Sequence, residues 1–192
     1  MCVSQPIRKT EDIAALKNYF LNTKPNMRNY AIVCLGINSA LRIGDLLSLT
    51  WGDVYDFEKG VFLRHIAIVE KKTGKQTLNA LNKNATEALH LYKDTLSGLK
   101  GSDFLFPGRG AASPLSRQQA FRILKDAGRV LKFEAEISCH SLRKTFGYHA
   151  WKAGVPPIIL MNIFNHSSFR ITKRYLGIEQ DDKDQVFLDV NL

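Results

Sequence analysis

Residues 29–40 carry apolar side chains on most sides of a helix, and this run constrains the fold more than any other stretch of the chain. A helix that is apolar all round lies inside a protein rather than on its surface. The run therefore predicts a central helix that other elements cover and that delivers Arg42 at its end. Cys34, inside the run, is most simply a core residue.

The rest of the pattern is also mostly helical. Residues 10–22 begin with a threonine and two acidic residues, which is typical of a helix start, and place apolar side chains on one face. Asn84 and Ser116 each stand three residues before a Glu or Gln, the spacing of a capping box, and predict helices of about 14 residues each. Two more helices are expected over residues 141–153 and from Ser168 onward.

One hairpin interrupts the helices. Over residues 61–81, β-branched residues and leucines flank the turn-forming sequence Lys72-Thr73-Gly74-Lys75, which predicts two strands with this turn at the tip. The expected fold is mainly α with a small antiparallel β-sheet, an α+β fold. The 192 residues, 45% of them hydrophobic, suffice for one compact core, so a single domain over residues 1–192 is expected.

The charge pattern favours a polyanionic partner. The net charge is +9, and residues 137–178 contain six Lys or Arg but no Asp or Glu. Tyr175 lies in this acid-free stretch, nine residues after His166. A tyrosine on a helix is more often a half-buried packing residue than a nucleophile. Basic surroundings, however, lower the free-energy cost of ionising a phenol, whose ordinary pKa is about 10.

Two arginines and a lysine supply the positive charge that attack on a phosphodiester needs. The non-bridging oxygens gather negative charge during attack, and fixed cationic donors stabilise them. Because guanidinium stays protonated and gives one phosphate two parallel bonds, Arg42 and Arg143, with Lys72, qualify as substitutes for divalent metals. His140 lies three residues before Arg143, so both would share one helical face. Taken alone, this spacing more often marks a capping histidine and a solvated arginine.

The order and spacing of these motifs resemble the tyrosine recombinases, the phage-integrase family. The matching segments are two arginine motifs, a hairpin lysine, a histidine turn and a final tyrosine: Ala40-Leu41-Arg42-Ile43-Gly44-Asp45 with its continuation to Val54, Lys71-Lys72-Thr73-Gly74-Lys75, Leu142-Arg143-Lys144-Thr145-Phe146, Phe164-Asn165-His166-Ser167-Ser168 and Thr172-Lys173-Arg174-Tyr175. Each segment is common alone, but the ordered set is not expected by accident. Phe164-Asn165 departs from the Leu-Gly that the family usually places before this histidine.

The resemblance implies a site-specific recombinase or integrase with the catalytic-domain fold of the family. Tyr175 would attack a DNA phosphodiester and form a 3′-phosphotyrosyl bond. Lys72 would protonate the departing 5′-oxygen, because a leaving hydroxyl of very high pKa needs a proton donor. No metal, ATP or other cofactor would take part.

Five further residues would support this chemistry. Arg42 and Arg143 would hold the non-bridging oxygens of the phosphate. His140 and His166 would orient the phosphate and assist proton transfer. Asp45 would brace the site, since a carboxylate in contact with phosphate would repel it.

The resemblance also implies double-stranded DNA as the partner and self-association, as a dimer or tetramer, on that DNA. Further basic residues are expected to contact DNA: Lys71, Lys75, Lys144, Arg170, Lys173 and Arg174. The stretch after residue 178 is acidic with an apolar end at Val186-Phe187-Leu188, so we expect it to dock on a neighbouring protomer. A closing helix within the same protomer is the alternative.

Only 41 residues precede Arg42, whereas complete family members usually carry a separate DNA-clamping domain there. No separate N-terminal core-binding domain is expected, so the chain would be an excised catalytic domain or a minimal recombinase. Two other functions stay open. A type IB topoisomerase uses the same nucleophile and arginines, and a DNA-binding remnant would bind without cutting.

The cysteines and histidines argue against other classes of protein. Three unpatterned cysteines do not form a disulfide framework, and the five histidines lack metal-ligand spacing. No stretch approaches the roughly 20 apolar residues of a membrane span, and no signal peptide is apparent. A cytoplasmic, nucleoid-associated protein is expected.

Overall fold

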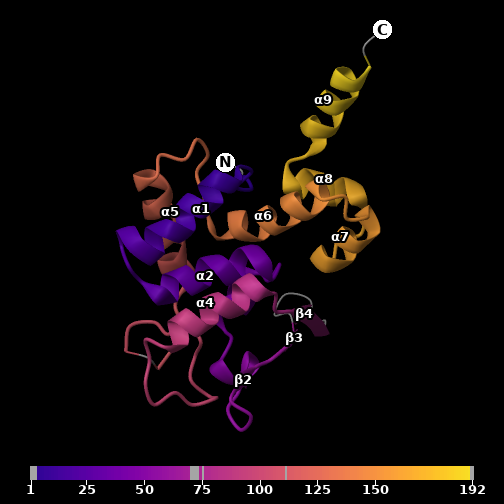
Figure 1. Ribbon diagram of the computed structural model, residues 1–192. Helices are drawn as coiled ribbons and strands as arrows, with labels where there is room; N and C mark the ends of the chain where they lie inside the picture. The colour runs from indigo at the N-terminus through magenta and orange to yellow at the C-terminus, as the bar shows by residue number, and fades with distance from the viewer. Residues whose placement is uncertain (1–3, 70–73, 75, 111, 191–192) are drawn as a thin grey trace.

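The computed structural model describes residues 4–69, 74, 76–110 and 112–190. The predicted class is confirmed, because helices dominate and the strands form two small antiparallel sheets (Figure 1). The α-helices are α1 Thr10–Asn18, α2 Met27–Asn38, α3 Ile43–Leu47, α4 Lys83–Lys93, α5 Arg117–Val130, α6 Cys139–Lys152, α7 Pro157–Phe164, α8 Phe169–Leu176 and α9 Glu179–Asp189. A π-helical turn, Tyr19–Thr23, continues α1, and a 3₁₀ turn covers Trp51–Asp53.

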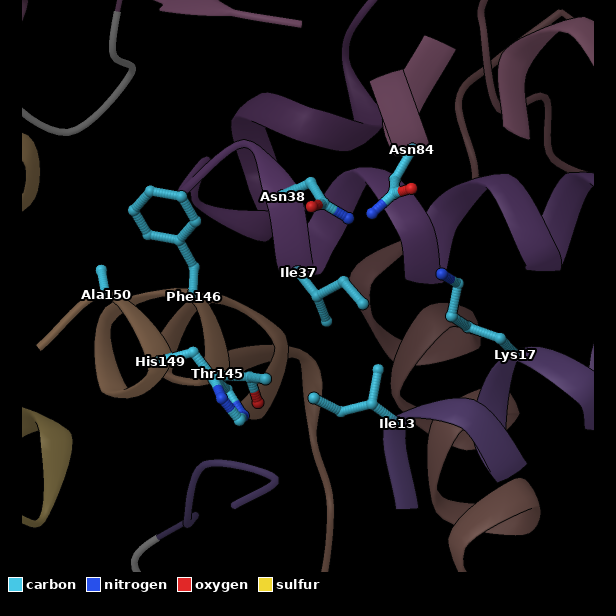
Figure 2. A pocket seen from close by; sticks show the side chains of 9 residues that line it. All are labelled: Ile13, Lys17, Ile37, Asn38, Asn84, Thr145, Phe146, His149 and Ala150. Atoms are coloured by element: carbon cyan, nitrogen blue, oxygen red, sulfur yellow. The ribbon is translucent and has the colours of Figure 1, made fainter. Parts of the chain in front are cut away.

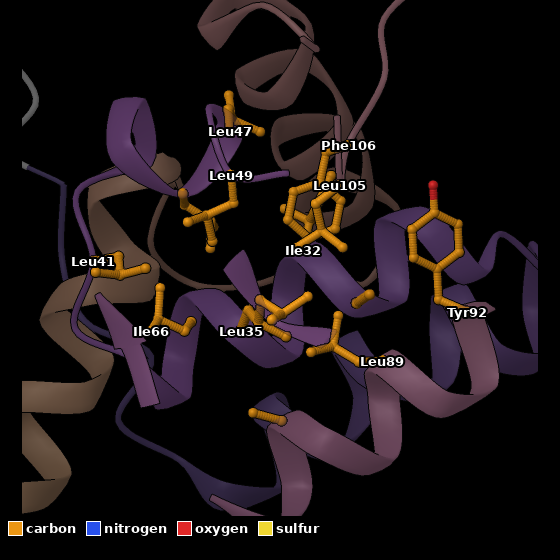
Figure 3. Packing of buried hydrophobic residues seen from close by; sticks show 14 of the residues in the cluster. Ile32, Leu35, Leu41, Leu47, Leu49, Ile66, Leu89, Tyr92, Leu105 and Phe106 are labelled. Carbon is orange, nitrogen blue, oxygen red and sulfur yellow. The ribbon is translucent and has the colours of Figure 1, made fainter. Parts of the chain in front are cut away.

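The predicted central helix is confirmed. Residues 31–35 of α2 are at most 2% exposed, and α2 packs against both α4 and α6. Around Ile32 and Leu35 lie Ile66, Leu89 of α4 and Phe106, which come from three different parts of the chain (Figure 3). Because α2 is fixed on all sides, the segment that follows it and carries Arg42 has a defined position.

Side-chain caps set the helix starts. The capping box at Ser116 is confirmed, since Gln119 and Ser116 satisfy each other's backbone N–H groups. The capping box at Asn84 is wrong, because Asn82 accepts the bond from the Ala85 N–H and begins α4 two residues earlier. Helix α6 also begins two residues before the predicted start, with a serine cap at position 138.

Two hairpins make up the sheets. In the predicted hairpin, β3 His65–Val69 pairs with β4 Gln76–Ala80, and Val69 lies opposite Gln76. Lys71, Lys72 and Lys75 of its predicted tip lie outside the described residues. A second pair, β1 Tyr55–Asp56 with β2 Val61–Phe62, was not expected.

Helices α6, α7 and α8 pack against one another, with α7 and α8 at the right of Figure 1. At Gly147 of α6, a Cβ atom would stand 2.5 Å from Leu176 Cδ2 and 2.6 Å from Phe164 Cζ. Glycine at this position therefore lets α8 lie directly against α6. Helix α9 follows α8 and extends away from the body (Figure 1). Among the described residues, no helix has the length and apolar character that a membrane crossing requires.

Candidate active site

A cavity of about 640 Å³ opens between α3, α5, α6 and the α7–α8 region. Five of the six predicted catalytic residues and the predicted supporting carboxylate line it, together with their neighbours: Arg42, Ile43, Gly44, Asp45, Arg117, His140, Arg143, Phe164, Asn165, His166 and Tyr175. The sixth, Lys72, lies outside the described residues. Segments that lie up to roughly 130 residues apart in sequence thus meet at this cavity, as expected of a composite site.

The two predicted arginines reach the cavity from different elements. Arg42 is the N-cap of the short helix α3 and has an extended backbone. Arg143 lies in the second turn of α6 and is only 6% exposed. Its guanidinium lies over the Phe164 ring, 5.0 Å from the centroid, and Nη2 donates to the Phe164 carbonyl oxygen at 3.5 Å. These contacts fix a delocalised cation beside the cavity.

The two predicted histidines come from different elements. His140 is exposed in the first turn of α6. His166 lies in the turn between α7 and α8, where its Nδ1 is 3.1 Å from Thr172 Oγ1. Asn165 ends α7 with φ +55°, in the left-handed region where asparagine is the most tolerated substitute for glycine. The departure from the usual family sequence therefore keeps the turn that places His166.

Tyr175, on α8, packs against aromatic rings from α7 and from the turn that follows α7. Its ring is 5.2 Å from the His166 ring, edge to face, and 5.4 Å from the Phe164 ring. Burial raises the pKa of the Tyr175 phenol, while the charges of Arg143 and Arg42 and a hydrogen bond with Arg143 lower it. The net direction is upward. The two arginines lower the pKa of the phenol, as expected of basic neighbours, but burial raises it by more.

The residues expected to contact DNA do not share one environment. Arg170 and Arg174 are exposed on α8, and Lys173 lies over the Phe169 ring at 5.6 Å. Lys144 differs from the expectation, because it is only 5% exposed and its Nζ donates to the Ser4 carbonyl oxygen at 2.7 Å. The N-terminal segment that supplies the Ser4 carbonyl covers this side chain, so it does not face solvent. The remaining two, Lys71 and Lys75, lie outside the described residues.

Sequence reasoning missed Arg117, the first residue of α5. It lines the cavity, and a Cβ at Gly44 would stand 3.1 Å from its Nη2, so its guanidinium lies against α3. The capping box at Ser116 did predict a helix start here. It could not indicate that this start faces the segment after α2, because that contact joins residues about 70 positions apart in sequence.

A separate cavity of about 330 Å³ lies between α1, α2 and α6, and none of the predicted site residues lines it (Figure 2). Its walls include Ile13 of α1, Ile37 of α2 and the α6 residues Thr145, Phe146 and His149. Within the described part of the chain, no cluster of three or more His, Cys, Asp or Glu side chains is placed to hold a metal ion.

Comparison with known proteins places the chain among recombinases. The family model described as "Phage integrase family" matches residues 9–181. The chain is 40% identical over 182 residues to "Probable integrase/recombinase YoeC" of Bacillus subtilis (strain 168), covering 94% of this chain and 93% of that protein. It is 31% identical over 151 residues to "Type 1 fimbriae regulatory protein FimE" of Escherichia coli (strain K12), covering 77% of this chain and 73% of that protein.

Solved structures share the fold at low sequence identity. The crystal structure of XerA recombinase matches 96% of this chain with a TM-score of 0.74 and 22% identity. XerH site-specific recombinase, bound to a palindromic difH substrate in a post-cleavage complex, matches 87% with a TM-score of 0.68 and 19% identity. The chain spans 64% of the XerA chain and 48% of the XerH chain.

Proposed function

The chain belongs to the phage integrase family, and from this premise we propose that it is a site-specific DNA recombinase that breaks and rejoins DNA through a 3′-phosphotyrosyl bond. The observation that carries the proposal is the cavity in which Tyr175 meets Arg42, Arg143, His140 and His166. Two guanidinium groups and a nucleophile lining one cavity suit a phosphodiester, whose transition state carries negative charge.

The proposed cleavage step transfers the phosphoryl group from the 5′-oxygen of DNA to the oxygen of Tyr175. The Tyr175 oxygen attacks the phosphorus, loses its proton and becomes bonded to the 3′-phosphate, while the bond to the 5′-oxygen breaks. Arg42 and Arg143 hold the non-bridging oxygens. Lys72 gives the 5′-oxygen a proton, a role that the resemblance assigns to it. Because the tyrosyl ester retains the bond energy, a 5′-hydroxyl from another strand reverses the step and completes strand exchange.

Proton removal from Tyr175 needs assistance in this proposal. A phenol is neutral at neutral pH even at its ordinary pKa of about 10, and burial raises the pKa of Tyr175 further, so a neighbouring base must take the proton during attack. His166 stands edge to face against the ring at 5.2 Å, and His140 opens on the same cavity from α6. We assign to this pair the orientation of the phosphate and the movement of that proton.

Double-stranded DNA is the proposed partner, and Arg170 and Arg174 extend the positive surface beyond the cavity. We also propose that protomers associate on DNA through α9. Val186, Phe187 and Leu188 on this helix are 60%, 79% and 77% exposed, which is unusual for such large apolar side chains side by side. A neighbouring protomer would cover them.

A nicked suicide substrate tests the proposed reaction. The nick beside the scissile phosphate lets the short fragment that carries the freed 5′-hydroxyl diffuse away. Because this hydroxyl can no longer reverse the step, an active enzyme remains covalently bound to DNA. We expect wild-type protein to form an adduct that denaturing gels and mass spectrometry locate at Tyr175. Tyr175→Phe should bind DNA with nearly unchanged affinity and form none.

Tyr55→Phe is the matched control, because Tyr55 lies on β1, outside the cavity, and its ring contact with Lys93 needs no hydroxyl. It should form the adduct at the wild-type rate. An adduct that persists in Tyr175→Phe would contradict the assignment of the nucleophile. DNA binding without an adduct in the wild type would favour a non-cutting DNA-binding protein.

A further inference from the structure

Lys144 is a buried cation that the proposed chemistry does not use. It is 5% exposed, it does not line the catalytic cavity, and burial lowers the pKa of its ammonium group. Taking an ammonium group out of water is unfavourable unless other contacts compensate. The position of Lys144 therefore requires specific partners.

Two contacts hold the ammonium group. Lys144 Nζ donates to the Ser4 carbonyl oxygen at 2.7 Å and lies 5.1 Å from the centroid of the Tyr175 ring. A cation over the face of a tyrosine ring is attracted by its negative π-density, and the attraction grows when both groups are desolvated. One lysine thus joins the N-terminal segment to the proposed nucleophile.

The carbonyl group of Ser4 belongs to a segment that is itself fixed. We call residues 4–9 the N-terminal strap. Ile7 N–H donates to Thr145 Oγ1 at 2.8 Å, and His149 Nε2 lies 3.0 Å from the Ile7 carbonyl oxygen. Thr145 and His149 both belong to α6, and they also form one wall of the separate cavity (Figure 2). The strap therefore runs along the helix that carries Lys144.

The strap also reaches the far end of α8. Arg8 Nη2 donates to the Gly177 carbonyl oxygen at 2.7 Å, and Nη1 pairs with Asp181 Oδ1 at 2.8 Å. Tyr175 lies two residues before Gly177, so strap contacts at α6 and at the end of α8 flank the nucleophile. Its ring contacts the Lys144 ammonium group as well as the rings of Phe164 and His166.

We propose that Lys144 is a positioning residue for Tyr175, with its strap-bound ammonium group holding the ring so that the phenol oxygen stays beside Arg143 in the cavity. The inference rests on the proposed function, since it takes Tyr175 as the nucleophile. Loss of the cation has two consequences. The ring gains rotational freedom, and the phenolate loses a nearby positive charge.

Four variants separate charge from packing. Lys144→Met keeps the length of the side chain and removes the charge, whereas Lys144→Arg keeps the charge. Lys144→Gln is neutral but can still donate to the Ser4 carbonyl oxygen, so it replaces the Met variant if that protein does not fold. Lys152→Met is the matched control, because Lys152 is exposed on the same helix.

Two measurements decide the outcome. The first is the single-turnover rate of adduct formation on the suicide substrate between pH 6 and 11. The second is NMR of ring-labelled tyrosine in the DNA-free protein, with the Tyr175 signal assigned from Tyr175→Phe. We expect Lys144→Met and Lys144→Gln to slow the adduct by about 10- to 100-fold, as small misplacements of reacting groups do. DNA affinity should change by less than about twofold.

The pH dependence of the rate and the Lys144→Arg variant distinguish a role of the charge from a role in packing alone. Without the cation, the rising limb of the pH–rate profile and the titration of the Tyr175 signal should move to higher pH, and Lys144→Arg should reverse most of that shift. An unmoved Tyr175 signal in the neutral variants, or equal losses in the Arg and Met variants, would overturn the inference. A wild-type protein that forms no adduct would instead overturn the proposed function.

Discussion

Arg117 illustrates what a folded site adds to a sequence motif. It is exposed at the start of α5, and its guanidinium lies against Gly44, next to the segment that carries Arg42. Three arginines from different elements, Arg42, Arg117 and Arg143, therefore line one cavity. An arginine placed in this way is available to a DNA phosphate next to the scissile one, and each such contact releases counterions when DNA binds.

We predict that Arg117→Ala weakens DNA binding and makes it less sensitive to salt. The slope of log K against log salt should become shallower by about one unit, the value for one phosphate contact. Fluorescence anisotropy of labelled duplex between 50 and 300 mM salt measures it. Arg129→Ala is the control, because Arg129 is exposed in the last turn of the same helix. Equal changes in both variants would indicate diffuse attraction rather than a defined contact.

The two described cysteines should be poor nucleophiles. Burial raises the pKa of the Cys34 and Cys139 thiols to about 11 each. Because the thiolate reacts and not the thiol, a pKa of about 11 leaves about 10⁻³ of each group reactive at pH 8. We predict that iodoacetamide at pH 8 modifies both at least about 100-fold more slowly in the folded protein than in urea.

Peptide mass spectrometry follows each thiol of this pair separately. The rates in the folded protein should rise as the pH increases towards 11, since the thiolate fraction grows. Cys139 is the more demanding case, because it begins α6 and a helix N-terminus ordinarily lowers a thiol pKa. Rapid modification of Cys139 at pH 8 would show that the helix terminus outweighs burial.

The candidate site was largely predictable from the sequence, because its residues lie in short motifs with fixed spacing. Arg42, Arg143 and Tyr175 were identified in this way, and the structure brings them to one cavity. Two residues could not be identified. Arg117 joins the site through a contact between distant segments, and the inward turn of Lys144 depends on the strap that covers it.

Among the helices, α6 and α8 show how one glycine sets the geometry of the site. Gly147 stands where a methyl group would meet Leu176 and Phe164. Because Tyr175 directly precedes Leu176, any shift of α8 away from α6 also moves the nucleophile. The closeness of this contact therefore links a packing detail to the position of the reacting oxygen.

We predict that Gly147→Ala destabilises the protein by about 1–3 kcal/mol, the usual cost of overpacking. This direction is opposite to the gain of about 0.5–1 kcal/mol that alanine normally brings inside a helix. Urea denaturation measures the change. Adding Leu176→Ala should give a double variant that is more stable than the sum of the single changes predicts, by at least about 0.5 kcal/mol. Additive effects would show that the two side chains do not meet.

Local signals predicted most elements but not all of them. The apolar run of α2 and the capping box of α5 were sufficient, because a continuous pattern and a reciprocal cap each specify a helix. Strands β1 and β2 have two residues each, too few for an alternating pattern to appear. The start of α4 was misplaced because Asn82 and Asn84 are both good capping residues, and only the fold selects between them.

Across the whole molecule, α9 is the element least integrated into the body (Figure 1). Near its start Asp181 pairs with Arg8 of the strap. Farther along, Val186 and Phe187 border an open groove with the basic residues Arg170 and Lys173 of α8. The helix thus has a cis attachment at one end and an exposed apolar surface at the other, as a segment needs if it is to dock on a neighbour.

We predict that replacing Val186, Phe187 and Leu188 together by serine leaves the free protein almost unchanged but impairs assembly on DNA. These side chains are 60–79% exposed, so the free energy of unfolding should change by no more than about 1 kcal/mol. Covalent cleavage of a single half-site should continue, whereas sedimentation should show fewer multimers on DNA with paired sites. Leu78→Ser on β4, where the leucine is 66% exposed, controls for lost surface hydrophobicity. Undiminished assembly in the triple variant would contradict docking between protomers, and a loss of several kcal/mol in stability would show that α9 closes onto its own domain.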